Sequence, residues 1–234
     1  MRTFWRTVDR SLVRDVAALA AAVGLVGLSF GAIATGAHLP LWAVVAMSTL
    51  IFAGGSQFLA AGLIAAGNPV AAVLAGLLLN ARHLPFGMAI GDLLGRGPAR
   101  LLLGSHLMVD ESVAFALAQS DPRRRRAAYW LTGAGLFVTW NIGALAGALL
   151  GGAVGDPAVF GLDAAFPAGL FALLLPGLRT PNRADPAAPW VAGAGALIAV
   201  AATPLAPAGL PVLLALVALG LAFVVPVRKA AVSC

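Results

Sequence analysis

LWAVVAMSTLIFAGGSQFLAAGLIAA, residues 41–66, has no charged residue and exceeds the roughly 20 residues that a helix needs to cross a bilayer. Gly54-Gly55-Ser56-Gln57 interrupts this run near its middle. Glycine pairs weaken a helix and Ser is a favoured N-cap, so we predict that residues 57–66 form a half-helix. Its positive N-terminus would open at mid-membrane and suit an anionic group. A second interpretation stays open: the glycines allow close packing, and Ser56 and Gln57 bond to a neighbouring helix.

Similar apolar runs fill the rest of the chain and predict an all-α, polytopic integral membrane protein with some discontinuous helices. The last two runs form two spans or one bent hairpin, which gives about eight transmembrane helices, or seven if they merge. We expect residues 1–234 to form a single transmembrane transporter domain. The other predicted segments are spans at 16–37, 68–91, 98–119, 127–153 and 163–178, a Pro-rich connector at 179–189, and C-terminal helices within 190–227.

The composition excludes an ordinary soluble enzyme. Of the 234 residues, 61% are hydrophobic and 10% are charged, whereas a soluble domain is about a quarter charged. Gly27-Leu28-Ser29-Phe30-Gly31 fits the hydrolase pattern G-x-S-x-G. That chemistry needs a strand-turn-helix elbow and a His base, but Ser29 lies deep in an apolar run. We therefore predict that the protein is not an enzyme.

The arginines predict the topology. The net charge is +6, and Lys229 is the only lysine among 15 cations. With eight spans and cytoplasmic termini, twelve cations lie inside and only Arg96 and Arg100 outside, as the positive-inside rule requires. The cluster at 123–126 has no interleaved aromatic or Gly-rich motif, so we interpret it as a cytoplasmic loop and not as a nucleic-acid site. We expect a multi-pass protein of the cell membrane.

Ionisable side chains fall inside the predicted spans, among them Arg82, His83, Asp110 and Glu111. Each charge costs about 2.5–3.5 kcal/mol at mid-bilayer on insertion scales, so these groups must face one another or a water-filled cavity. Arg82 can pair with one acid, which leaves the second acid over. Either the group is an interhelical clamp, or His83, Asp110 or Glu111 exchanges protons during transport. Asn80 lines the same cavity or bonds between helices.

Other local signals concern helix packing and breaks. The spacings Gly27-xxx-Gly31 and Gly143-xxx-Gly147-xxx-Gly151 predict faces that pack closely on other helices. Asn68-Pro69 predicts a capped helix start, and Pro85 predicts a break in the third span. Residues 48–55 and 162–169 share Phe-x-x-Gly, which indicates an internal repeat or a chance likeness between Gly/Ala-rich helices.

Five short motifs occur in order along residues 11–178. They are Phe52-Ala53-Gly54-Gly55-Ser56-Gln57-Phe58, Asn80-Ala81-Arg82-His83 with Gly87, Asp110-Glu111, Trp140 with Gly143 and Gly147, and Gly161-Leu162-Asp163-Ala164-Ala165-Phe166-Pro167. Together they resemble the AzlC family of branched-chain amino acid transport proteins, the larger subunit of a two-component exporter. The resemblance implies export of Val, Leu, Ile and analogues such as azaleucine, with a small hydrophobic AzlD-type partner. Phe86 replaces the Tyr expected before the glycine.

The residues also predict how an amino acid is held, because a zwitterion needs a positive pole and an acidic pole. We expect its carboxylate at the Gly55-Ser56-Gln57 half-helix and Arg82, and its ammonium at Asp110 or Glu111. His83 or the remaining acid would exchange a proton. We predict no cofactor and no bound metal. The apolar side chain would lie against Phe52, Phe58 and Phe166.

A second class of function stays open: a cation or metal-ion transporter or channel. His106 and Asp110 are predicted to lie one helical turn apart, where they can share an ion with Glu111 and His83. The chain offers no internal Cys and no second spaced pair, so this donor set fits a transition metal poorly.

Overall fold

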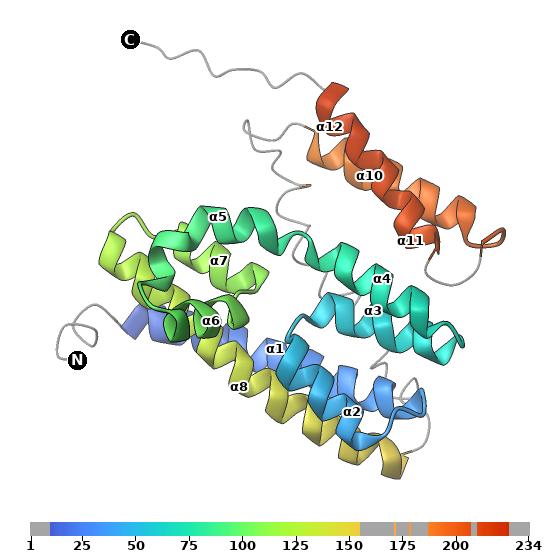
Figure 1. Cartoon of the computed structure of the whole chain (residues 1–234), viewed down its shortest axis with the longest axis horizontal. Coiled ribbons are helices and arrows are strands. Elements are labelled where there is room, and N and C mark those ends of the chain that lie inside the picture. Colours follow the sequence, from blue (N-terminus) through green and yellow to red (C-terminus); the bar gives the residue numbers. More distant parts are fainter. Residues whose placement is uncertain (1–9, 155–170, 172–177, 179–186, 207–209, 225–234) are drawn as a thin grey trace.

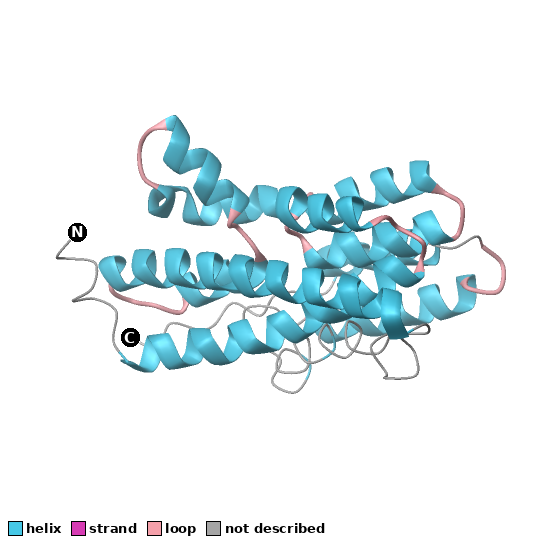
Figure 2. Cartoon of the chain, turned by 90° about the horizontal axis from the view of Figure 1, so that it is seen from below, coloured by secondary structure: helices cyan, strands magenta, loops and turns pink. Residues whose placement is uncertain are grey.

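The computed structural model describes residues 10–154, 171, 178, 187–206 and 210–224. All regular structure in these residues is helical, which confirms the all-α class (Figure 2). Most of the predicted sixth span, with Phe166 and the second copy of the repeat, lies outside them. In chain order the elements are α1 (Arg10–Gly36), α2 (Leu41–Ala46), the π-helix η1 (Met47–Ile51), α3 (Gly54–Ala65), α4 (Pro69–Asn80), α5 (His83–Leu94), α6 (Pro98–His106), α7 (Asp110–Leu117), α8 (Pro122–Val154), α10 (Ala188–Ala202), α11 (Leu210–Ala215), the 3₁₀-helix η3 (Leu216–Gly220) and α12 (Leu221–Val224).

Two long apolar helices, α1 and α8, lie side by side along the molecule (Figure 1). They run parallel, because Leu12 packs with Ala128 near their N-termini and Ala32 meets Gly151 near their C-termini. We call the end with both N-termini the arginine end, since it carries the cluster at 123–126, and the opposite end the far end. Both helices are long and apolar enough to cross a membrane, as predicted.

Glycines set the close approach of α1 and α8. A Cβ built at Gly27 would lie 2.7 Å from the carbonyl oxygen of Trp140, and one at Gly147 would overlap the backbone of Leu28. Only glycine lets the two backbones come this near, so the predicted small-residue faces are confirmed.

Helices α4 and α5 form one bent path from the far end to the arginine end (Figure 1). Asn68 caps α4 as predicted, with its Oδ1 accepting a hydrogen bond from Ala71 N at 3.1 Å. The path bends by 45° at Ala81-Arg82, and as one unit it is long and apolar enough to cross a membrane. The predicted break in the third span is confirmed, and it lies at Ala81, four residues before Pro85. Pro85 itself fits within the first turn of α5, where its missing N–H costs little.

The second predicted span is instead a hairpin that turns back halfway; we call residues 41–65 the first hairpin. It enters from the far end through α2 and η1, and Phe52 at its tip packs on Phe137 in the middle of α8. Helix α3 then returns to the far end antiparallel to α4, with Leu63 packed on Ala72.

The fourth predicted span is a hairpin from the opposite end; we call residues 98–117 the second hairpin. Leu107 at its tip lies against Gly133, where a Cβ would come within 2.8 Å of the Leu107 carbonyl oxygen. Gly133 is roughly 16 Å along α8 from the start of that helix, about half of a bilayer core. The chain then returns to the arginine end, where Arg124 Nε donates to Gln119 Oε1 at 2.6 Å.

These hairpins correct the predicted topology. Arg96 and Arg100 were expected on the side opposite the cluster at 123–126, but Gly95 lies against the guanidinium of Arg126. The described residues hold two helices that qualify as membrane spans, or three with the bent pair counted as one, and do not supply about eight. Hydropathy measures apolar length and cannot detect a reversal within an apolar run.

The C-terminal helices pair with one another. Helix α10 packs on α11 and η3, and Gly195 approaches Ala215 and Ala218 (Figure 1). The two short apolar runs predicted in this region are therefore helices that pack on each other, an arrangement that both predicted alternatives, two spans or one bent hairpin, allow.

Candidate functional site

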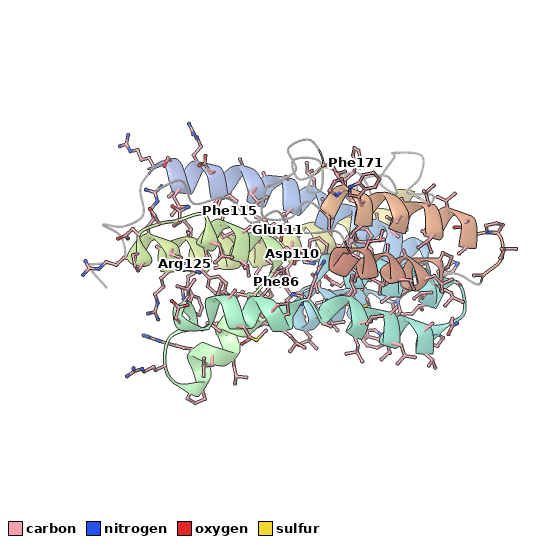
Figure 3. All side chains as sticks on the ribbon, turned by 90° about the horizontal axis from the view of Figure 1, so that it is seen from above. Phe86, Asp110, Glu111, Phe115, Arg125 and Phe171 are labelled. Carbon is pink, nitrogen blue, oxygen red and sulfur yellow. The ribbon has the colours of Figure 1, made fainter. Side chains whose placement is uncertain are left out.

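Three helix breaks meet near the middle of the molecule. They are the tip of the first hairpin at Phe52-Ala53, the bend at Ala81-Arg82, and the tip of the second hairpin at 107–109. The Phe52 ring lies 6.2 Å from the ring of His106, which links the two hairpin tips. Arg82 Nη1 lies 3.1 Å from Asp110 Oδ2, which links the bend to the second hairpin. The three breaks therefore form one site. Figure 3 labels two of its acidic residues, Asp110 and Glu111.

The ion pair of Arg82 and Asp110 confirms the predicted meeting of opposite charges. Arg82 lies between α4 and α5, and Asp110 is the first residue of α7. Their side chains are 32% and 36% exposed, so a ligand can reach both. Arg82 Nε and Asp110 Oδ1 are buried and have no hydrogen-bond partner among the described residues. Each side chain thus keeps hydrogen-bonding capacity that the described residues do not use.

Glu111 is the surplus acid that the sequence predicted. It follows Asp110 in the first turn of α7, where the helix dipole favours a carboxylate. Adjacent helical residues point about 100° apart, so the two acids cannot pair equally well with Arg82, and it is Asp110 that forms the ion pair. Glu111 is partly buried and forms no ion pair within the described part of the chain.

Asn80 and His83 flank the bend. His83 Nδ1 lies 2.9 Å from the Asn80 carbonyl oxygen, and its ring contacts Phe86 edge to face at 6.1 Å. The side-chain oxygen of Asn80 is buried and has no hydrogen-bond partner among the described residues. This oxygen therefore forms no hydrogen bond to another described helix. His83 is at the break but forms no ion pair with a described acid.

The first hairpin confirms the predicted half-helix but moves its start. Phe52 adopts left-handed backbone angles (φ 43°, ψ 51°), and α3 begins at Gly54 with Ala53 as N-cap. Ser56 is therefore inside the first turn, and its Oγ donates to the Ala53 carbonyl at 2.9 Å. The prediction of Ser56 as N-cap was wrong, because the conformation of Phe52 ends the preceding helix before the glycine pair.

Gln57 is the most unusual residue of this tip. It is 0% exposed, and neither its Oε1 nor its Nε2 has a hydrogen-bond partner in the described residues. An unpaired buried amide costs roughly 1–3 kcal/mol. Nearby, Gly54 lies against the indole of Trp140, whose Nε1 is also buried and unpaired among the described residues. Trp140 belongs to one of the five sequence motifs, but the motif itself does not indicate a role for this side chain.

The aromatic residues divide into two groups. Phe52 contacts Phe137 edge to face at 5.0 Å at the meeting point of the hairpins. Phe58 instead packs against Phe30 and Trp140 at 5.5 and 6.3 Å, within the core between α1 and α8. Phe58 is therefore part of the hydrophobic core. Phe137, and not Phe58, is the aromatic residue that lies beside Phe52. No sequence signal distinguished Phe137 from other phenylalanines.

The donor set predicted for a metal ion is not assembled. His106 ends α6 and Asp110 begins α7, so they do not lie one turn apart on one helix as predicted. His106 packs against the Phe52 and Phe137 rings. Across the described ranges, no group of three His, Cys, Asp or Glu side chains is placed to hold a metal ion.

Comparison with known proteins places this arrangement in a family. The family model described as AzlC protein matches residues 18–154, more than half of the chain and all three breaks. The "Branched-chain amino acid transport protein AzlC" of Bacillus subtilis (strain 168) is 35% identical over 126 residues, 51% of this chain and 48% of that protein. The match thus spans about half the length of that relative, and no solved structure matches the chain. The chain belongs to the AzlC family.

Proposed function

We propose that this protein exports branched-chain or other apolar amino acids across the cell membrane, linked to protons and together with a small AzlD-like subunit. The observation that supports this most is the Arg82–Asp110 pair, held at 3.1 Å where three helix breaks meet. The similarity to a branched-chain amino acid transport protein agrees with it.

The ion pair matches the charges of the substrate. An amino acid brings one carboxylate and one ammonium, so it can insert between Arg82 and Asp110 and replace one ion pair by two. The net charge of the site does not change, and this limits the electrostatic cost of burial. The unused Arg82 Nε and Asp110 Oδ1, with Asn80 Oδ1, supply further hydrogen bonds to the bound zwitterion.

The first hairpin supplies the remaining contacts. The N-terminal turn of α3 presents Gly55, Ser56 and the buried Gln57 amide to the substrate carboxylate, in keeping with the positive end of a helix. Phe52 and Phe137 form an apolar wall beside these groups. Such a wall favours Val, Leu and Ile over amino acids with polar side chains.

The two hairpins provide access from opposite sides. The first hairpin enters from the far end and the second from the arginine end, and their tips meet at the site. Displacing one tip at a time opens the site to one side of the membrane only, which is the requirement for alternating access. The arginine end lies in the cytoplasm by the positive-inside rule.

Glu111 is the proton carrier in this scheme, with His83 as a second candidate. While Asp110 holds the ammonium group, Glu111 is free to bind a proton on one side and release it on the other. The small subunit covers part of the apolar outer face of α4, where Val70, Val73 and Leu77 are exposed.

Counterflow of labelled leucine into proteoliposomes tests the substrate site. We expect Arg82→Ala and Asp110→Asn to lower uptake at least about 100-fold, since each leaves one pole of the zwitterion unpaired. Asp15→Asn is the matched control, because Arg14 and Asp15 form an exposed pair at 3.4 Å outside the site. Full uptake by Asp110→Asn would refute the proposal.

A further inference from the structure

The turn between α5 and α6 gathers positive charge at the arginine end. In Gly95-Arg96-Gly97-Pro98 both glycines have positive φ, 89° and 99°. The guanidinium of Arg126, from α8, lies against Gly95, and a Cβ at Gly95 would stand 3.5 Å from Cδ of Arg100. Two cationic side chains from different helices thus flank one turn, which itself exposes a third at Arg96.

The acidic side chains of the described residues do not balance this cluster. Within the described residues the only ion pairs are Arg14–Asp15 and Arg82–Asp110. Asp92, one turn before the glycines on α5, forms no ion pair there, and Asp121 accepts a hydrogen bond from the backbone N–H of Arg124 at 2.8 Å. The charges at Arg96, Arg100 and Arg126 therefore leave a site for an external anion.

The surface next to the cluster is apolar. Helix α6 begins at Pro98, has Arg100 in its first turn and leads toward the middle of the molecule. The next three residues, Leu101, Leu102 and Leu103, are 44%, 73% and 54% exposed. Cationic side chains at the end of the helices, followed inward by exposed leucines, match a headgroup followed by acyl chains. A soluble phosphate would match only the charged part of this surface.

We propose that Arg96, Arg100 and Arg126 bind the phosphate of an anionic phospholipid, whose acyl chain covers Leu101, Leu102 and Leu103. Basic clusters at the cytoplasmic end of membrane helices attract such lipids. The lipid binds at the base of the second hairpin and holds that hairpin against α8. The proposal rests on the chain being a membrane protein but is independent of the substrate that is transported.

The test uses the full chain purified in detergent and titrated with phosphatidylglycerol or phosphatidylcholine, with native mass spectrometry and thermal unfolding as readouts. We expect phosphatidylglycerol to remain bound and to raise the unfolding temperature, and phosphatidylcholine to do neither. Arg100→Gln/Arg126→Gln should weaken phosphatidylglycerol binding about 30-fold, since each arginine near an anionic lipid contributes a factor of roughly five. Arg100→Lys/Arg126→Lys should keep most of the affinity.

The control is Arg10→Gln/Arg14→Gln, which removes the same charge from the same end but leaves the turn intact. Equal loss of binding in this control would overturn the proposal, because net charge alone would then explain it. Equal binding of both lipids by the wild type would overturn it too. Stabilisation by soluble glycerol phosphate as strong as by phosphatidylglycerol would replace the lipid by a free anion. Leucine counterflow by these variants reports on the transport site separately.

Discussion

The two hairpins reach the same depth from opposite ends, but their tips differ in chemistry. The first hairpin has no charged residue, and its tip is buried, with Phe52 4% and Gln57 0% exposed. The second carries Asp110 and Glu111 directly after its tip, and Asp110 is about one-third exposed. The first tip is therefore suited to anchor and to shape the site, whereas the second is suited to exchange partners. Variants in each hairpin separate these roles.

The largest expected effect concerns the charged tip. Glu111→Gln removes the proton carrier but keeps the ion pair of Arg82 and Asp110. We expect leucine export driven by a pH gradient to fall to the level without a gradient, while counterflow at equal pH persists. Vesicles with an imposed pH gradient provide the measurement. If Glu111→Gln and Asp110→Asn both keep the wild-type pH dependence, protons are not coupled through this tip.

Backbone contacts of the two tips predict the next effect. A Cβ at Gly133 would lie 2.8 Å from the Leu107 carbonyl oxygen, which cannot move without shifting the second hairpin. We expect Gly133→Ala to destabilise the protein by about 1–3 kcal/mol and to slow transport. Gly54→Ala meets the edge of the Trp140 ring at 3.0 Å, so we expect a smaller loss in unfolding temperature. Equal losses would mean that both tips are equally fixed.

Sequence patterns predicted one-segment features well. The glycine spacings of α1 and α8, the Asn68 cap and the half-helix near Gly54 were all predicted. The Arg82–Asp110 pair joins two segments and was predicted for a different reason, the cost of an isolated charge in a membrane. The reversals at Phe52 and at 107–109 were not, because each lies inside a run that is apolar enough for one crossing. The distribution of arginines gave one hint of these reversals, because Arg96 and Arg100 were the only cations that the predicted topology placed outside the cell. The hairpins remove these exceptions by bringing Arg100 beside Arg126.

Site membership was harder to predict, since it depends on contacts between segments. Phe52 and Phe58 occur in one motif, but the left-handed turn at Phe52 directs the two rings to different places. His106 and Asp110 have helical spacing, and a break between them removes the expected ion site. Phe137 became recognisable only from its contact with the tip of the first hairpin.

A smaller effect concerns the buried amide of the first tip. Gln57→Leu removes two unpaired polar atoms, so we expect the ligand-free protein to gain about 1–2 kcal/mol of stability. If Gln57 binds the substrate, the rise in unfolding temperature with leucine should largely disappear. Thr132→Val is the control, because Thr132 is also buried and its hydroxyl is unpaired among the described residues. An undiminished leucine response in Gln57→Leu would exclude Gln57 from the site.

The smallest expected effect tests how the first tip is anchored. Ser48 Oγ donates to Asn141 Oδ1 at 2.8 Å, and Asn141 Nδ2 donates to the Phe137 carbonyl at 2.8 Å, so η1 is bonded to α8 just before the tip. We expect Ser48→Ala to cost about 0.5–1.5 kcal/mol, the net value of one hydrogen bond. Thr49→Ala is the control, because Thr49 Oγ1 bonds within its own segment to the Val45 carbonyl. If the first hairpin is a static anchor, Ser48→Ala lowers the unfolding temperature without changing the leucine transport rate; a faster rate would show that the first tip also moves.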